Sequence, residues 1–175
     1  GNNGDDVNEY TLTTGFDVST ASFVDSFDIS SQELGPRDLA FSADGTKMFV
    51  VGVIGDDVNE YTLSTAFDVS TSSFVDSFDI SSQENSPTGL AFNNDGTKMF
   101  IAGNGGDDIN EYTLTTGFDV STASFVDSFD VSSQDTAPNG LTFNSDGTKM
   151  YVVGNQGNDI NEYDLTLGCL LYTSP

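Results

Sequence analysis

The sequence repeats itself every 51 residues, and this period constrains the fold more than any other feature. The tripeptide Asn-Glu-Tyr recurs at this spacing, ending at Tyr10, Tyr61, Tyr112 and Tyr163. Residues 52–102 and 103–153 are identical at 35 of 51 positions, with no insertion between them. Tandem copies of one unit that is too short to be a domain indicate a repeat architecture, in which neighbouring units bury each other's apolar faces.

Each unit is predicted to contain four short antiparallel strands. In one copy these are residues 89–93, 98–102, 109–114 and 125–131. The first two strands flank Asp95-Gly96, a pair that supplies the positive φ of a tight hairpin. Four antiparallel strands in a tandem unit of 40–50 residues are typical of a β-propeller blade. We therefore expect an all-β propeller of about three blades.

The ends of the chain fall inside units, so the predicted ring is incomplete. The expected divisions are a part-blade at 1–34, blades at 35–85 and 86–136, and a part-blade at 137–167. Residues 168–175, which include Cys169, leave the repeat and are interpreted as a tail outside the fold. Open edge strands favour pairing. Either the segment belongs to a longer ring, or two copies form a homodimer that completes a ring of about six blades.

One stretch of each unit resembles a known family of repeats. Residues 39–52, Leu-Ala-Phe-Ser-Ala-Asp-Gly-Thr-Lys-Met-Phe-Val-Val-Gly, are similar to the first hairpin of YVTN-type and lactonase-like propeller repeats of bacterial surface proteins. The same pattern returns at 90–103 and 141–154. The resemblance implies a blade hairpin rather than a particular chemistry, and it suggests an extracellular or cell-surface location.

Composition excludes several kinds of function. The chain has 28 acidic and 4 basic residues, a formal net charge of −24, no His, no Trp and a single Cys. Such a field repels phosphate, so no nucleic-acid partner is expected, and no apolar run is long enough for membrane insertion. Histidine bases, a Ser-His-Asp triad and an intrachain disulfide are excluded by the residue counts.

The candidate ligand residues lie in acidic loops and in the third strands of the units. The loop carboxylates are Asp5, Asp6, Asp56, Asp57, Asp107, Asp108 and Asp159. Oxygen ligands in Gly-rich loops suit calcium, although aspartate also favours tight turns for its own sake. Glu60 and Glu111 are either inward ligands or solvent-facing members of an alternating strand. Tyr10, Tyr61 and Tyr112 are expected to stack on sugar rings or to pack in the core.

The near-identity of the blades suggests a non-enzymatic role. An active site needs different residues in different roles, and the chain offers one arginine, Arg37. We therefore expect no enzyme, but a binding or scaffolding module that takes a protein or glycan ligand on its acidic loop face. The alternatives are a calcium-dependent lactonase-like hydrolase and a multivalent glycan-binding propeller.

Overall fold

Thirteen strands in four antiparallel sheets form the part of the chain, residues 4–165, that the computed structural model describes. This confirms the predicted all-β propeller segment. The first sheet pairs β1 (Asp6–Leu12) with β2 (Ala21–Asp28). The second contains β3 (Pro36–Phe41), β4 (Lys47–Gly52), β5 (Asp57–Leu63) and β6 (Ser72–Asp79). The third contains β7 (Pro87–Phe92), β8 (Lys98–Gly103), β9 (Asp108–Leu114) and β10 (Ala123–Asp130). The fourth contains β11 (Pro138–Phe143), β12 (Lys149–Gly154) and β13 (Ile160–Asp164).

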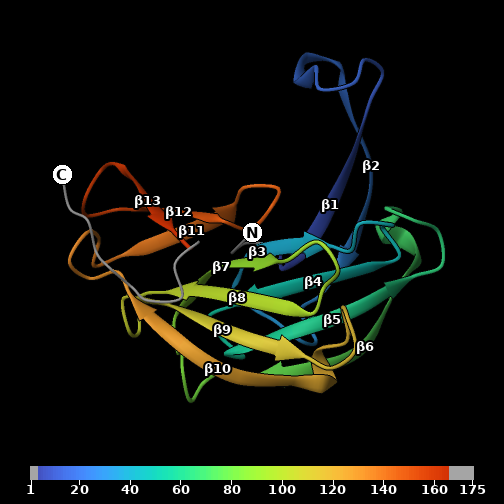
Figure 1. Ribbon diagram of the computed structural model, residues 1–175. Helices are drawn as coiled ribbons and strands as arrows, with labels where there is room; N and C mark the ends of the chain where they lie inside the picture. Colours follow the sequence, from blue (N-terminus) through green and yellow to red (C-terminus); the bar gives the residue numbers. More distant parts are fainter. Residues whose placement is uncertain (1–3, 166–175) are drawn as a thin grey trace.

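In each complete sheet the strands are hydrogen-bonded to one another in chain order, so that the first strand lies at one edge and the fourth strand at the other. The first strands β3, β7 and β11 lie side by side near the middle of the assembly, and the third and fourth strands lie outside them (Figure 1). This is the radial arrangement of propeller blades.

Aspartate and glycine shape the hairpin that joins the first two strands of each unit. Gly45, Gly96 and Gly147 all have φ near +70°, a conformation that costs glycine little. In the first of these hairpins the Asp44 carboxylate accepts hydrogen bonds from the Ser42 and Thr46 hydroxyls, at 2.7 and 2.8 Å. The predicted Asp-Gly hairpins are therefore present.

A short 3₁₀ turn, which the sequence pattern did not indicate, follows the third strand of three units. These turns are η1 (Val18–Thr20), η2 (Val69–Thr71) and η3 (Val120–Thr122). Asp17 and Asp68 cap the first two by accepting a hydrogen bond from a serine N–H. Each turn has only three residues, too few to produce helical periodicity.

The core lies between neighbouring sheets. Between the second and third sheets, Phe49, Val58, Ile101 and Tyr112 belong to one buried cluster. A corresponding cluster between the third and fourth sheets includes Ile109, Val131 and Val152. Cys169 and the tail 168–175 lie outside the described residues. Within residues 4–165, no helix has the length and apolar character to cross a membrane.

Candidate active site at the inner strands

The first strands β3, β7 and β11 are called the inner strands. Near the start of these strands, equivalent residues of the three copies belong to different chemical classes. At one register position they carry Arg37, Thr88 and Asn139, and at the next Asp38, Gly89 and Gly140. We call these six residues the inner rim. The loops on either side also differ between copies, at 34–35, 85–86 and 136–137 and at 53–54, 104–105 and 155–156. Much of the variation therefore lies at this end of the inner strands, although the hairpins at the other end also differ, at Ala43, Asn94 and Ser145.

A β-bulge places the first residue of each inner-rim pair outside the regular ladder. Pro36 pairs with Gly52 and Asp38 pairs with Val51, so Arg37 has no partner between them. The same register shift skips Thr88 and Asn139. A bulge re-aims a side chain and is frequent beside active sites. In this propeller, the bulged positions between the first and second strands of each unit are among those at which the copies are chemically distinct.

Buried carboxylates hold the loops around the inner rim. Glu33 accepts hydrogen bonds from the N–H groups of Gly35, Ile54 and Gly55, at 2.5, 3.2 and 3.3 Å. It thereby joins the loop that enters β3 to the loop that leaves β4. Glu84 and Asp135 make the equivalent contacts in the next two units, with Gly105 and Gly157 among their donors. These carboxylates stabilise loop structure.

Polar side chains also connect neighbouring inner strands. Asp38 Oδ2 accepts a hydrogen bond of 2.9 Å from the N–H of Leu90 in β7. Thr88 Oγ1 donates to the Pro138 carbonyl of β11 at 2.7 Å. A Cβ on Gly89 would lie 3.1 Å from the Gly140 Cα, so glycine permits the close approach of β7 and β11. The inner rim is thus a packed polar surface.

Arg37 is the charged group that this surface leaves accessible. It is exposed, and it is the single arginine of the chain. A guanidinium stays protonated and offers a planar set of donors, which suits a carboxylate, a phosphate or a developing oxyanion. Sequence reasoning did not select Arg37, Thr88 or Asn139, because it looked for what the copies share. Comparing the copies for their differences would have found all three.

Most of the acidic residues predicted as calcium ligands make local contacts at the start of the third strand of their own unit. Asp5, Asp56, Asp107 and Asn158 occupy the left-handed backbone region, with φ between +48° and +58°. Asp57 and Asp108 accept hydrogen bonds of 2.7 Å from the Asn59 and Asn110 side chains, and Asp6 and Asp159 make the same contact with Asn8 and Asn161. Within residues 4–165, no three His, Cys, Asp or Glu side chains are grouped so that they could hold a metal ion.

Burial changes the ionisation of the second aspartate in two of these loops. Desolvation raises the pKa of Asp57, and the nearby carboxylates of Glu33 and Asp79 raise it further, against the Asn59 hydrogen bond. Desolvation likewise raises the pKa of Asp108. The charged form of each carboxylate is therefore less favourable in the fold than in water.

The two glutamates predicted in third strands occupy different environments. Glu60 is buried and binds Lys47 Nζ at 2.7 Å and the Val120 N–H at 2.9 Å. Glu111 pairs with Lys98 on a more open surface. Neither belongs to the inner rim, since both lie on the strand that is third from the axis.

The three tyrosines proposed for sugar stacking also differ in exposure. Tyr61 and Tyr112 are fully buried, and desolvation raises their pKa values. Their rings make edge contacts with Phe27 and Phe78 of the preceding sheets. Tyr10 is about half exposed. A sugar ring could therefore reach only Tyr10 without opening the core.

The chain matches a family described as "Lactonase, 7-bladed beta-propeller" over residues 5–170. No curated protein sequence matches it. Solved structures share the fold at low sequence identity. A Lactobacillus plantarum protein is 14% identical, with a TM-score of 0.68 over 91% of this chain and 45% of its own. A candidate 6-phosphogluconolactonase of Bacteroides fragilis is also 14% identical, with a TM-score of 0.67 over 91% of this chain and 44% of its own.

A periplasmic gluconolactonase of Pseudomonas aeruginosa is 19% identical, with a TM-score of 0.60 over 91% of this chain and 44% of its own. The chain therefore spans less than half the length of these solved relatives. The family match contradicts the expectation of a non-enzymatic binding or scaffolding module. It supports the alternative, a lactonase-like hydrolase. The physical argument against catalysis overlooked the inner rim, where the copies are not alike. Since the match extends over nearly the whole sequence, the chain belongs to the lactonase family of seven-bladed β-propellers.

Proposed function

We propose that this chain is part of a lactonase-like hydrolase and that its inner rim contributes to the substrate site. The observation that carries the proposal is the concentration of unlike polar residues, Arg37, Thr88 and Asn139, at bulged positions of adjacent inner strands. Family membership and the gluconolactonase named among the structural relatives favour a sugar lactone as the substrate class.

Lactone hydrolysis adds water to a ring ester. Water attacks the carbonyl carbon, the carbonyl oxygen takes up negative charge, and the ring C–O bond then breaks. The attacking water loses a proton and the alkoxide leaving group takes one up, so that a hydroxy acid is formed. A fixed guanidinium beside the carbonyl oxygen stabilises the developing charge and also binds the carboxylate product. Arg37 is the residue of this chain that can do both.

Asp38 and Thr88 act as positioning residues in this scheme. Their hydrogen bonds to Leu90 and Pro138 hold three inner strands in register around Arg37. Asn139 adds a neutral amide suited to a sugar hydroxyl. Since the chain spans less than half of its solved relatives, further inner strands in a longer ring would supply the rest of the site.

Hydrolysis of glucono-δ-lactone, followed by acid release and corrected for the spontaneous rate, tests the proposal. Arg37→Ala should lower kcat/KM by at least tenfold, and Arg37→Lys should restore part of it. Lys149→Ala is the matched control, since it removes a cation in an exposed ion pair on β12. Measured in a protein that carries the complete ring, a wild-type rate equal to the spontaneous rate, or equal rates for wild type and Arg37→Ala, would overturn the assignment.

Calcium binding, the type of the hairpins and the location of the protein are also proposed. We propose calcium as an accessory ion of the acidic loops, tested by comparing the same rates in EDTA and in added calcium. We also propose that the hairpins are of the YVTN type and that the protein is extracellular or at the cell surface. The net charge of −24 is consistent with an acidic protein of saline surroundings.

A further inference from the structure

The two loops beside Arg37 carry apolar side chains, whereas the same loops of the other two units carry polar ones. Leu34 lies before β3, and Val53 and Ile54 follow β4. The corresponding residues are Asn85, Asn104 and Gly105 in the next unit, and Thr136, Asn155 and Gln156 in the unit after it. The end of the second sheet that bears the guanidinium is therefore apolar, and the equivalent ends of the third and fourth sheets are polar.

Leu34 and Ile54 are largely open to solvent, with exposed fractions of 54% and 62%. This exposure belongs to their position in the fold. The corresponding Asn85 and Gly105 are exposed too, although their unit has a described sheet on either side. Grouped apolar side chains at an exposed position beside a polar rim are typical of a surface that binds a ligand.

The backbone of the two apolar loops is fixed by contacts between them. The buried Glu33 carboxylate accepts hydrogen bonds from the N–H groups of Gly35 and Ile54. A Cβ on Gly35 would lie 3.0 Å from side-chain carbons of Val53 and Ile54, so glycine lets the loops approach closely. The apolar surface is therefore already formed next to the inner rim.

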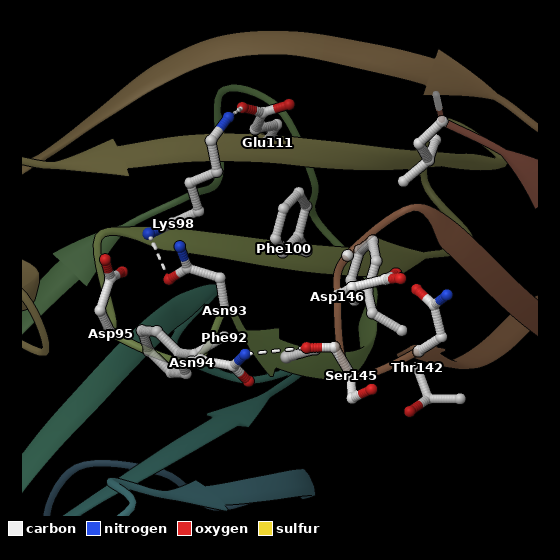
Figure 2. Close-up of a pocket in the computed structure, with 15 residues that line it drawn as sticks. Phe92, Asn93, Asn94, Asp95, Lys98, Phe100, Glu111, Thr142, Ser145 and Asp146 are labelled. Carbon is white, nitrogen blue, oxygen red and sulfur yellow. Dashed lines mark hydrogen bonds and ion pairs between the residues drawn. The ribbon is translucent and has the colours of Figure 1, made fainter. Parts of the chain in front are cut away.

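Variation at the opposite end of the strands has a structural use. There the Asn94 side chain donates a hydrogen bond of 3.0 Å to the Ser145 carbonyl, which joins two neighbouring hairpins (Figure 2). The side chains of Leu34 and Ile54 have no polar atoms for such a contact, and more than half of each is exposed. Their difference from the other units is therefore available to a ligand.

We propose that the lactone bound at the inner rim carries an alkyl substituent, which lies over Leu34 and Ile54 while the ring carbonyl lies beside Arg37. This inference rests on the proposed hydrolase function. Branched aliphatic side chains offer contact to hydrocarbon but no aromatic face for stacking. The amide groups of Asn104 and Gln156, on the polar loops, suit hydroxyl groups on the remainder of the molecule. The substrate class is thus an amphiphilic lactone.

Two lactones with the same ring test this proposal in a protein that carries the complete ring of blades. δ-Decalactone has a pentyl group on the ring of δ-valerolactone, and acid release from each is corrected for the spontaneous rate. The value of kcat/KM for δ-decalactone should be higher by about tenfold or more, because its alkyl group leaves water for an apolar surface. Leu34→Thr combined with Ile54→Gln should reduce this ratio to near one. The unit of the fourth sheet has Thr136 and Gln156 at these positions, so the loops accommodate both side chains.

Two further variants show whether the ratio reports the apolar loops. Val75→Thr combined with Val126→Thr is the matched control, since it removes two half-exposed apolar side chains from the outer strands β6 and β10. It should leave the ratio unchanged. Arg37→Ala should lower both rates by a similar factor. Equal wild-type values for the two lactones, or a preference that survives the Leu34 and Ile54 substitutions, would overturn the proposal.

Binding of the ring-opened acids separates failure of this proposal from failure of the proposed function. Calorimetry with the same protein should show tighter binding of the acid that carries the alkyl group, and the Leu34 and Ile54 substitutions should abolish the difference. If neither lactone is hydrolysed, the hydrolase assignment fails, but this binding result still supports an alkyl group on the apolar loops. Equal binding of the two acids, or binding of neither, contradicts it.

Discussion

The carboxylate of Glu60 accepts a hydrogen bond of 2.9 Å from the N–H of Val120, which belongs to the next blade. Its other oxygen lies 2.7 Å from Lys47 Nζ. Glu9 makes the same 2.9 Å contact with the Val69 N–H one unit earlier. A charged side chain is thus shared between two blades, and the interface between them includes polar contacts as well as apolar packing.

Removing this carboxylate should therefore weaken the joint between the blades. The Glu60 side chain is 2% exposed, and deleting one partner of a buried ion pair typically costs 3–5 kcal/mol. Since Lys47 is 31% exposed, we expect Glu60→Ala to lower the free energy of unfolding by about 3 kcal/mol. Glu111→Ala, at a site 30% exposed, should cost less than about 1 kcal/mol. Urea titration measures both, and equal losses would contradict the argument.

The repeat made the architecture predictable, because each strand recurs with its turn residues in the same register. The role of Glu60 could not be predicted in the same way. In an alternating strand, the Glu60 side chain could face either solvent or the interior. Its hydrogen-bond donor, the Val120 N–H, lies 60 residues away in the sequence. Only the packing of two blades distinguishes these environments.

The candidate site could not be predicted from the sequence for a related reason. Arg37, Thr88 and Asn139 carry no motif, and the identity of the surrounding sequence pointed away from catalysis. Their common bulge is a matter of strand register, which becomes visible when Pro36 and Asp38 are found paired with consecutive residues of β4. The acidic loops were more conspicuous in the sequence, but most of the predicted carboxylates accept hydrogen bonds from an asparagine two residues later in the chain.

Gly96→Ala should be more destabilising than Gly147→Ala. Both glycines have φ near +70°, so both substitutions incur the left-handed strain of an L residue, about 1 kcal/mol. Only at Gly96 would the new methyl also overlap the Phe118 ring, which adds about 1–3 kcal/mol of overpacking. Thermal unfolding compares the two. Equal midpoints would show that Phe118 is not seated as described.

Asp57→Asn should stabilise the protein at pH 7 and have no effect below about pH 3.8. Burial raises the pKa of Asp57 in the fold, so the unfolded state releases this proton first and stability falls as pH rises above the ordinary value of 3.8. An asparagine removes the charge and can still accept from the Asn59 side chain. Urea titrations at pH 3.5 and pH 7 measure the difference.

Asp44→Asn is the control for Asp57→Asn, because its expected effect on stability at pH 7 has the opposite sign. Hydrogen bonds from the Ser42 hydroxyl and from Thr46 lower the pKa of Asp44, so its ionised form contributes stability above pH 3.8 that is lost as pH falls through the folded value. Asp44→Asn should therefore destabilise at pH 7. If both substitutions shift stability in the same direction at pH 7, the assigned environments are wrong.

Salt should stabilise this chain at neutral pH. A formal net charge of −24 produces mutual repulsion that is strongest in the compact state. The screening length falls from about 10 Å in 0.1 M salt to about 3 Å in 1 M, which weakens repulsion between exposed carboxylates. We expect Tm to rise between 0.1 M and 1 M NaCl at pH 7. At about pH 3, where most carboxylates are protonated, the rise should shrink, because little repulsion remains to be screened. An unchanged or lower Tm at pH 7 would show that ion pairs such as Lys47–Glu60, which salt also screens, outweigh the repulsion.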